Sequence, residues 1–449
     1  MTAFRRWRIF YLVVIELAQK YTKALLGGFV AGFLLSMLFS RVYPFIAQQW
    51  LTQTDRIGIV GEFTPNLLPL AIQNQISYGL TRLNEDGSVS PGLATSWVAT
   101  DSGKIFTFYL RKDVNWHDGK PVTAQDINYN IKNVTFTVVN NSTIHVILDN
   151  PYSPFPVLLS KPLFKPGLDG FGLYKVVSIQ LNGDKVSYIK LGPVTSKINH
   201  GKVLEYRFYP TEAAAILAYK LGEIDTINDL SAPNDLSHWG KTTVDEVTRY
   251  NRIVTLFFNL SDQLLADKSL RQTLAISLPD FPGERADSPI SKKSWAYTDK
   301  IKTFVTNMGL AKKDLASEKI SSESANLTIT TFSQYIDVAQ SIADNWTSIG
   351  IPTSVKVVNV LPSDYQILLS AQELPPDPDQ YPFWHSTQTQ TNITGYSNVK
   401  IDKLLEDGRQ ELDTTKRIAI YADFQRRLVD EAPALFLYYA KSYTVRRAL

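Results

Sequence analysis

The sequence predicts an α/β protein of more than one domain that carries an N-terminal membrane helix. Three observations lead to this fold class. Strand patterns alternate with helix patterns along most of the chain. The 449 residues, 44% of them hydrophobic, exceed the about 250–300 residues that one hydrophobic core usually holds. An uncharged apolar run, ALLGGFVAGFLLSMLF, covers residues 24–39.

The apolar run is long enough to act as a membrane anchor. Continued to residue 46, a helix over this run would cross about 30 Å of hydrocarbon. Basic residues lie mainly before it, which places the preceding segment in the cytoplasm; they are Arg5, Arg6, Arg8, Lys20 and Lys23. We therefore expect residues 1–50 to form a cytoplasmic N-terminus and a single-pass anchor in the cell membrane, with the rest extracytoplasmic. A cleaved signal peptide and a buried soluble helix are the alternatives, although no small-x-small cleavage site follows the run.

Composition excludes several kinds of partner and site. The net charge is only +3, with both signs mixed along the chain, so no clustered basic excess indicates a nucleic-acid partner. The sequence has no cysteine, which excludes disulfides, thiolate metal sites, cysteine nucleophiles and a lipid anchor on cysteine.

Local patterns predict the first elements after the anchor. Aromatic and β-branched residues predict a strand over 104–110. Thr123 is a typical N-cap, so we expect a helix over 123–132. Two β-branched runs, 134–139 and 143–148, flank Asn140-Asn141 and predict a hairpin.

The second half of the chain is richer in helix patterns. The pattern over 212–221 predicts a helix that Gly222 ends, and 335–349 predicts an amphipathic helix closed by Gly350. An apolar strand is expected over 252–259. Further helices are expected at 401–410 and 415–430, before a C-terminal strand at 435–439.

The search for catalytic chemistry favours a binding protein over an enzyme. The five histidines do not pair at metal-ligand spacing on any predicted helix. The sequence has no nucleophile elbow, no Walker loop and no dinucleotide glycine pattern, and its carboxylates are scattered. We therefore predict no catalytic residues, no cofactor and no metal.

Several segments occur in an order typical of a known family. They are PGLATSW at 91–97, FTFYLRKDVNWHDGKP at 106–121, TAQDI at 123–127, GFGLYK at 170–175, LGEID at 221–225 and APALFLYY at 432–439. Together they resemble the family 5 extracellular solute-binding proteins, the oligopeptide- and dipeptide-binding proteins. Independently of this resemblance, Trp97 and Trp116 are large enough to anchor the core of a small domain.

The resemblance implies a periplasmic-binding-protein type II fold of two lobes plus an extra small domain. Lobe I would combine 55–76, 165–254 and 432–449, the small domain would be 77–164, and lobe II would be 255–431. It implies a monomeric substrate-binding protein of an ABC importer, which closes over a peptide or similar small solute and delivers it to permease subunits. An extracytoplasmic sensor or scaffold on the same fold is the alternative function.

The resemblance also places the ligand site on the stretch 368–386. Asp377 and Asp379 are the candidates for binding a ligand ammonium, with Glu373 behind them. The side chains of Tyr381, Trp384 and His385 are candidates for the wall of a pocket. A solvated acidic turn and simple loop packing are the alternative interpretations. The sequence departs from the family here, because Leu374 stands where the dipeptide binders carry their ammonium-binding aspartate.

Overall fold

The structure is a computed structural model that describes residues 53–317 and 326–448, apart from Ser196, and a few isolated residues before position 53. Most of the predicted anchor, 24–39, therefore lies outside the described residues. Among the described residues, none of the helices has both the length and the apolar character that a membrane crossing needs.

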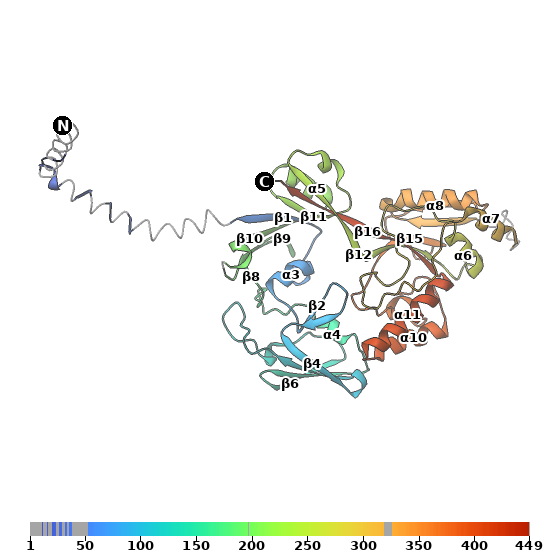
Figure 1. The fold of residues 1–449 in the computed structure, drawn as a ribbon, viewed down its shortest axis with the longest axis horizontal. Helices are drawn as coiled ribbons and strands as arrows, with labels where there is room; N and C mark the ends of the chain where they lie inside the picture. Colours follow the sequence, from blue (N-terminus) through green and yellow to red (C-terminus); the bar gives the residue numbers. More distant parts are fainter. Residues whose placement is uncertain are drawn as a thin grey trace, which may run out of the picture.

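A ten-stranded mixed sheet runs through the long dimension of the molecule (Figure 1). From one edge to the other its strands are β14 (Thr353–Val357), β13 (Leu327–Thr331), β15 (Ile367–Glu373), β12 (Thr242–Phe258), β16 (Ala434–Arg447), β11 (Thr226–Leu230), β1 (Thr54–Val60), β10 (Val203–Tyr209), β9 (Lys185–Pro193) and β8 (Tyr174–Asn182). The long strands β12 and β16 pair with each other in an antiparallel ladder whose register shifts between Thr248 and Ile253. Strand β12 extends from the predicted lobe I into the predicted lobe II, and residues 434–439 of β16, predicted for lobe I, are buried in the same core as the lobe II residues.

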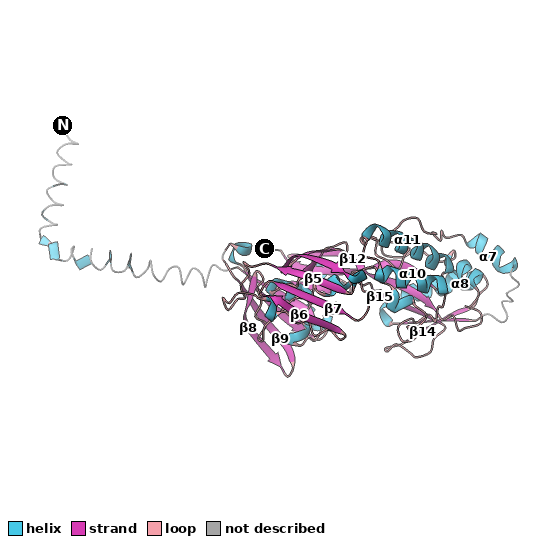
Figure 2. Cartoon of the chain, turned by 90° about the horizontal axis from the view of Figure 1, so that it is seen from below, coloured by secondary structure: helices cyan, strands magenta, loops and turns pink. Residues whose placement is uncertain are grey.

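Helices cover the lobe II end of this sheet. They are α6 (Lys268–Ala275), α7 (Met308–Ser317), α8 (Ile336–Ser348), α10 (Val399–Gln410) and α11 (Thr414–Glu431), and Figure 2 shows most of them gathered at one end of the molecule. In α8 the buried residues Ala339, Ile342, Ala343 and Trp346 recur at helical spacing. The indole Nε1 of Trp346 donates a hydrogen bond to the carbonyl of Leu274, 3.1 Å away, which fixes α8 against α6.

The predicted small domain has a separate four-stranded antiparallel sheet, ordered β4-β5-β7-β6. Its strands are β4 (Ala94–Thr100), β5 (Ile105–Leu110), β6 (Val134–Asn140) and β7 (Thr143–Leu148), with a short pair β2 (Thr81–Leu83) and β3 (Val89–Pro91) alongside. Trp116 is buried in the core of this domain and Trp97 packs against it, as the sequence predicts. Phe106 and Phe108 fill the same core.

Short helices pack on the other half of the large sheet, in the predicted lobe I. Helix α3 (Leu70–Ile76) buries Ile72 and Ile76 against β8–β10 residues, and α5 (Glu212–Lys220) buries Tyr219 against β11 and β16 residues. Gly222, with φ of +79°, ends α5 in the left-handed conformation that favours glycine.

Most predicted elements are confirmed, and one is wrong. The predicted hairpin at 134–148 is the antiparallel pair β6–β7. The helix predicted over 123–132 is only a 3₁₀ turn, Ala124–Asp126, in which Thr123 and Asp126 form a capping box. The backbone soon afterwards turns left-handed at Asn130 and Asn133, with φ of 48° and 62°, so the helix does not continue.

Gly79 allows two backbone segments of the predicted small domain to pack closely, because a side chain there would meet the backbone around Leu159. A Cβ at Gly79 would lie 2.1 Å from the carbonyl oxygen of Leu159. We expect Gly79→Ala to lower the free energy of unfolding by about 1–3 kcal/mol, because two backbone segments must move apart. Urea unfolding measures this change. Gly240→Ala is the control, because a Cβ there meets nothing within 4 Å; equal midpoints for both variants would contradict the expectation.

Candidate ligand site

The stretch predicted to bind the ligand begins as an internal strand of lobe II. Strand β15 pairs in parallel with β13 and antiparallel with β12. It ends at Glu373, an exposed residue whose carboxylate lies 3.4 Å from Nε of Arg252 and accepts a hydrogen bond from Asn251. Leu374 follows and is buried in the lobe II core. The chain thus places an apolar side chain, and not a carboxylate, at the position where the dipeptide binders carry their aspartate.

Asp377 is already paired with a cation of its own chain. Its two carboxylate oxygens lie 2.8 and 3.2 Å from the guanidinium nitrogens of Arg417 on α11, and both side chains are more than 90% buried. Burial raises the pKa of Asp377, and the charge of Arg417 opposes that rise. The role predicted for Asp377, binding a ligand ammonium, is not tested by this geometry, but the carboxylate has its counter-charge without any ligand.

Asp379 takes part in a contact between lobe II and the small domain. Nε of Arg409 lies 2.9 and 3.1 Å from its two oxygens, and the Tyr152 hydroxyl donates to it across 3.4 Å. The backbone N–H of Ser153 donates to the carbonyl of Arg409 at 2.7 Å. Burial, followed by the charge of Asp379, raises the pKa of Tyr152. This carboxylate therefore links the loop after β15 to Tyr152, which lies in the predicted small domain.

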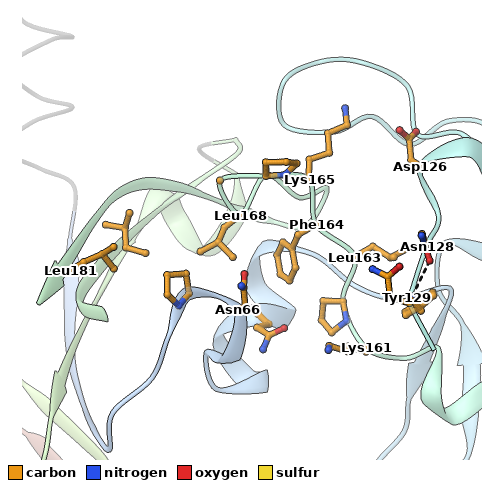
Figure 3. Close-up of a pocket in the computed structure, with 17 residues that line it drawn as sticks. Asn66, Asp126, Asn128, Tyr129, Lys161, Leu163, Phe164, Lys165, Leu168 and Leu181 are labelled. Carbon is orange, nitrogen blue, oxygen red and sulfur yellow. Dashed lines mark hydrogen bonds between the residues drawn. The ribbon is translucent and has the colours of Figure 1, made fainter. Parts of the chain in front are cut away.

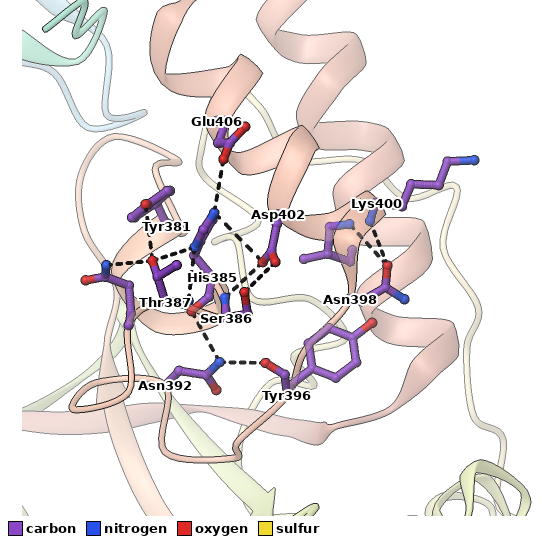
Figure 4. A network of polar contacts seen from close by, with 12 residues as sticks. Tyr381, His385, Ser386, Thr387, Asn392, Tyr396, Asn398, Lys400, Asp402 and Glu406 are labelled. Atoms are coloured by element: carbon purple, nitrogen blue, oxygen red, sulfur yellow. Dashed lines mark hydrogen bonds and ion pairs between the residues drawn. The ribbon is translucent and has the colours of Figure 1, made fainter.

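Tyr381 and Trp384 begin and end the short helix α9 (Tyr381–Trp384), and His385 follows it. Tyr381 stacks on His385, with ring centroids 4.0 Å apart. The His385 Nδ1 lies 2.9 Å from the Thr387 hydroxyl, and its Nε2 lies 3.4 Å from Glu406 (Figure 4). The imidazole is thereby held between the loop and α10.

Asp402 completes this network from α10. Its carboxylate accepts hydrogen bonds from the backbone N–H and the hydroxyl of Ser386, at 2.9 and 2.6 Å (Figure 4). His385 and its neighbours thus fix the loop after β15 to α10. Of the predicted wall residues, this leaves Trp384 facing a cavity.

A cavity of about 330 Å³ lies at the carboxyl ends of the parallel strands of lobe II. Its aromatic and aliphatic lining comes from several separate segments: Phe257, Phe332, Leu361, Leu368, Phe383 and Trp384. Phe332 directly follows β13, and Gln372 lies near the end of β15. Ligands of open α/β sheets bind at this edge, and the volume lies at the lower end of the usual range for ligand pockets, about 300–1,000 Å³.

None of the residues that line this cavity carries a formal charge. Its polar lining consists of hydroxyl and amide side chains, including Ser370, Gln372, Gln390, Thr391 and Thr394. Sequence reasoning included Trp384 but missed Phe257 and Phe332. The sequence signal for these two aromatics is their position at strand ends. Phe257 lies near the end of the strand predicted over 252–259, and Phe332 directly follows β13.

A second cavity, of about 600 Å³, lies between lobe I and the small domain (Figure 3). Lys161, Lys165 and Asp126 contribute charged side chains, and Leu168 and Leu181 contribute apolar ones. Lys165 is already paired with Asp118 at 3.2 Å. The residues predicted for the ligand do not line this cavity, and we take the lobe II cavity as the candidate ligand site.

Comparison with known proteins supports an interpretation as a binding protein. The profile named "Bacterial extracellular solute-binding proteins, family 5 Middle" matches residues 88–393. The oligopeptide-binding protein AppA of Bacillus subtilis (strain 168) is 23% identical, over 83% of this chain and 82% of its own length. The periplasmic murein peptide-binding protein MppA of Escherichia coli (strain K12) is 22% identical, over 80% of this chain and 81% of its own length.

Solved structures show the same fold at low sequence identity. The ABC transporter substrate-binding protein CtaP of Listeria monocytogenes superposes with a TM-score of 0.74 at 22% identity, covering 88% of this chain and 94% of CtaP. The Bacillus subtilis AppA structure, in complex with a nonapeptide, gives 0.64 at 20% identity, covering 88% and 95%. The fold is therefore that of type II periplasmic binding proteins, and the family match extends over more than half of the sequence. The chain belongs to the bacterial extracellular solute-binding proteins, family 5.

Proposed function

We propose that this chain captures a peptide or similar small solute outside the cytoplasm and delivers it to the permease subunits of an ABC importer. The observation that carries the proposal is the family match over 88–393, combined with an uncharged cavity at the carboxyl edge of lobe II. The relatives named above are peptide-binding proteins, which supports a peptide-like ligand. The protein would bind and release the solute without changing it chemically.

Closure of two lobes is the proposed mechanism. The proposed boundaries are those predicted from the sequence, with lobe I at 55–76, 165–254 and 432–449, and lobe II at 255–431. Separate buried clusters are in keeping with a division into lobes, because one holds the core residues of 255–431 and two others hold lobe I residues. The first cluster also takes in Ile253, Val254 and residues 432–439, which the proposed bounds assign to lobe I. Ligand contacts made only in the closed form would shift the population toward it, and the permease would engage that form.

The proposed tether is the apolar run 24–39, which holds the monomeric binding protein beside its transporter in the cell membrane. Its support is the basic flank before the run and the absence of charge within it. Tethering raises the effective concentration of the loaded protein at the permease. It also replaces the lipidated cysteine that this sequence lacks.

The ligand contacts proposed from the sequence divide into two groups. Trp384 lines the cavity, and Glu373 offers an exposed carboxylate at the end of β15. Asp377, Asp379 and His385 are engaged in the internal contacts described above, with Tyr381 stacked on His385. We propose that the second group shapes the loop that presents Trp384 to the solute.

Native mass spectrometry of the full chain, purified in mild detergent, tests the proposed function. We expect a co-purified solute of peptide size at up to one copy per chain, released intact when the protein is denatured. After the solute is removed, adding it back should restore the complex without chemical change. Chemical conversion of the solute, or failure to bind any peptide or small solute from a mixed pool, would contradict the proposal.

A further inference from the structure

The floor of the lobe II cavity is formed by cross-strand neighbours on one face of the sheet. In the β12–β15 ladder, Thr255 lies opposite Ser370 and Phe257 lies opposite Leu368. Directly opposed residues project from the same face of a sheet. Ser370, Phe257 and Leu368 line the cavity. Thr255 lies on the same face of the sheet beside Ser370, but it is fully buried and is not one of the lining residues.

Two oxygens on this face of the sheet are buried without a partner. Within the described part of the chain, the Thr255 hydroxyl and the Gln372 Oε1 atom have no hydrogen-bond partner. Thr255 is fully buried, and Gln372 lines the cavity two residues beyond Ser370 on the same strand. Buried polar atoms in proteins are almost always satisfied, so these two oxygens point to a hydrogen-bonding group supplied from outside the chain.

Aromatic side chains cover the same floor. Phe436, the partner of Thr255 on β16, meets Trp384 edge-to-face at a centroid distance of 6.1 Å. Phe332 and Phe383 contribute further aromatic lining. Flat apolar walls of this kind suit an aromatic group of the ligand. A charged group is disfavoured, because no residue that lines the cavity carries a charge and the carboxylates of Asp377 and Asp379 are already paired with arginines.

We propose that this cavity is a specificity subsite for an uncharged aromatic group that carries a hydrogen-bond donor, such as a phenol or an indole. The ring packs among Trp384, Phe332 and Phe383, and the donor reaches Gln372 Oε1, while the Thr255 hydroxyl lies buried beneath the lining on the same face of the sheet. The charged ends of the ligand lie elsewhere. This inference rests on the proposed function, because the subsite serves a solute that the protein carries.

The test uses three small probes that share a methyl-substituted benzene ring: p-cresol, toluene and 4-methylbenzylamine. Binding to the full chain in detergent is measured by ligand-detected NMR and calorimetry. We expect p-cresol to bind about tenfold or more tightly than toluene, because toluene leaves the buried oxygens unsatisfied. The cationic amine should bind at least about tenfold more weakly than p-cresol, since no lining residue carries a negative charge.

Two variants assign the preference to the floor. Gln372→Leu and Thr255→Val should each reduce the preference for p-cresol over toluene several-fold while toluene still binds. Gln340→Leu is the matched control, because Gln340 is exposed on α8 and bonded to Asp344; its preference should equal that of the unaltered protein. Equal binding of p-cresol and toluene, absence of binding by both, or a preference unchanged in both floor variants would overturn the proposal.

A peptide pair separates this inference from the proposed function. Ala-Tyr-Ala should bind more tightly than Ala-Phe-Ala if the protein carries peptides and uses this subsite. A protein that binds p-cresol through Gln372 but binds no peptide keeps the subsite and refutes the peptide ligand. A protein that binds both peptides equally keeps the carrier function and refutes the subsite.

Discussion

Arg417→Ala is expected to destabilise lobe II by about 3–5 kcal/mol, because it leaves the carboxylate of Asp377 buried without a counter-charge. The two side chains are each more than 90% buried and make two contacts of 3.2 Å or less. Arg417 also donates to the carbonyl of Gly408 at 2.9 Å, so α10 and α11 lose a link as well. Urea unfolding followed by circular dichroism measures the loss.

Two further variants separate the buried charge from the general loss of a side chain. The double variant Asp377→Asn with Arg417→Met should recover much of the stability, since no unpaired charge remains. Arg426→Ala removes an exposed partner of Asp423 on the same helix and should cost at most about 1 kcal/mol. Equal losses from Arg417→Ala and Arg426→Ala would show that the buried pair has no special weight.

Removing residues 1–50 is expected to move the protein from the membrane fraction to the soluble fraction completely. A spanning helix holds a protein far more firmly than a peripheral contact does, so an intermediate distribution is not expected. Fractionation of cells that express the full and the shortened chains, followed by protease treatment of intact cells, measures both attachment and sidedness. The shortened protein should still bind the solute identified with the full chain.

Point variants test the same tether without shortening the chain. Phe33→Lys with Leu34→Lys places two charges in the apolar run, at an insertion cost of about 2.5–3.5 kcal/mol each. Leu67→Lys, at an exposed position after β1, is the control and should leave attachment unchanged. N-terminal sequencing of the mature protein distinguishes an intact tether from a cleaved signal peptide. Finding residues 53–448 in the cytosol would refute the proposed sidedness.

The regular elements were predictable because their causes are local. Helix α5 ends at a glycine that the sequence displays, and α8 shows its buried stripe as a simple periodicity. The exception was the helix expected after Thr123. The cap predicted at Thr123 does form, as a capping box. The helix does not continue, because Asn130 and Asn133 adopt left-handed backbone conformations. The segment also lacks the periodic apolar stripe that would favour a longer helix.

The site was less predictable because its determinants are distant in sequence. In the sequence, Asp377 and Asp379 have no lysine or arginine nearby, so their carboxylates look free to bind a ligand. Their arginine partners lie 40 and 30 residues further along the chain. Sequence alone did not indicate which arginines would meet them. The cavity depends on register in the same way, since Thr255 lies beneath its floor only through its pairing with Ser370.

The position of β16 has a consequence for how the chain reaches its folded state. In the strand order, the half that contains β12 and the half that contains β11 meet only through β16, and β16 (Ala434–Arg447) follows every other strand of the sheet in the sequence. The two halves of the central sheet therefore cannot join until β16 is available, after all the other strands of that sheet have been synthesised. Such non-local pairing is slow to form, so the joining of the two halves is expected to be a late step of folding.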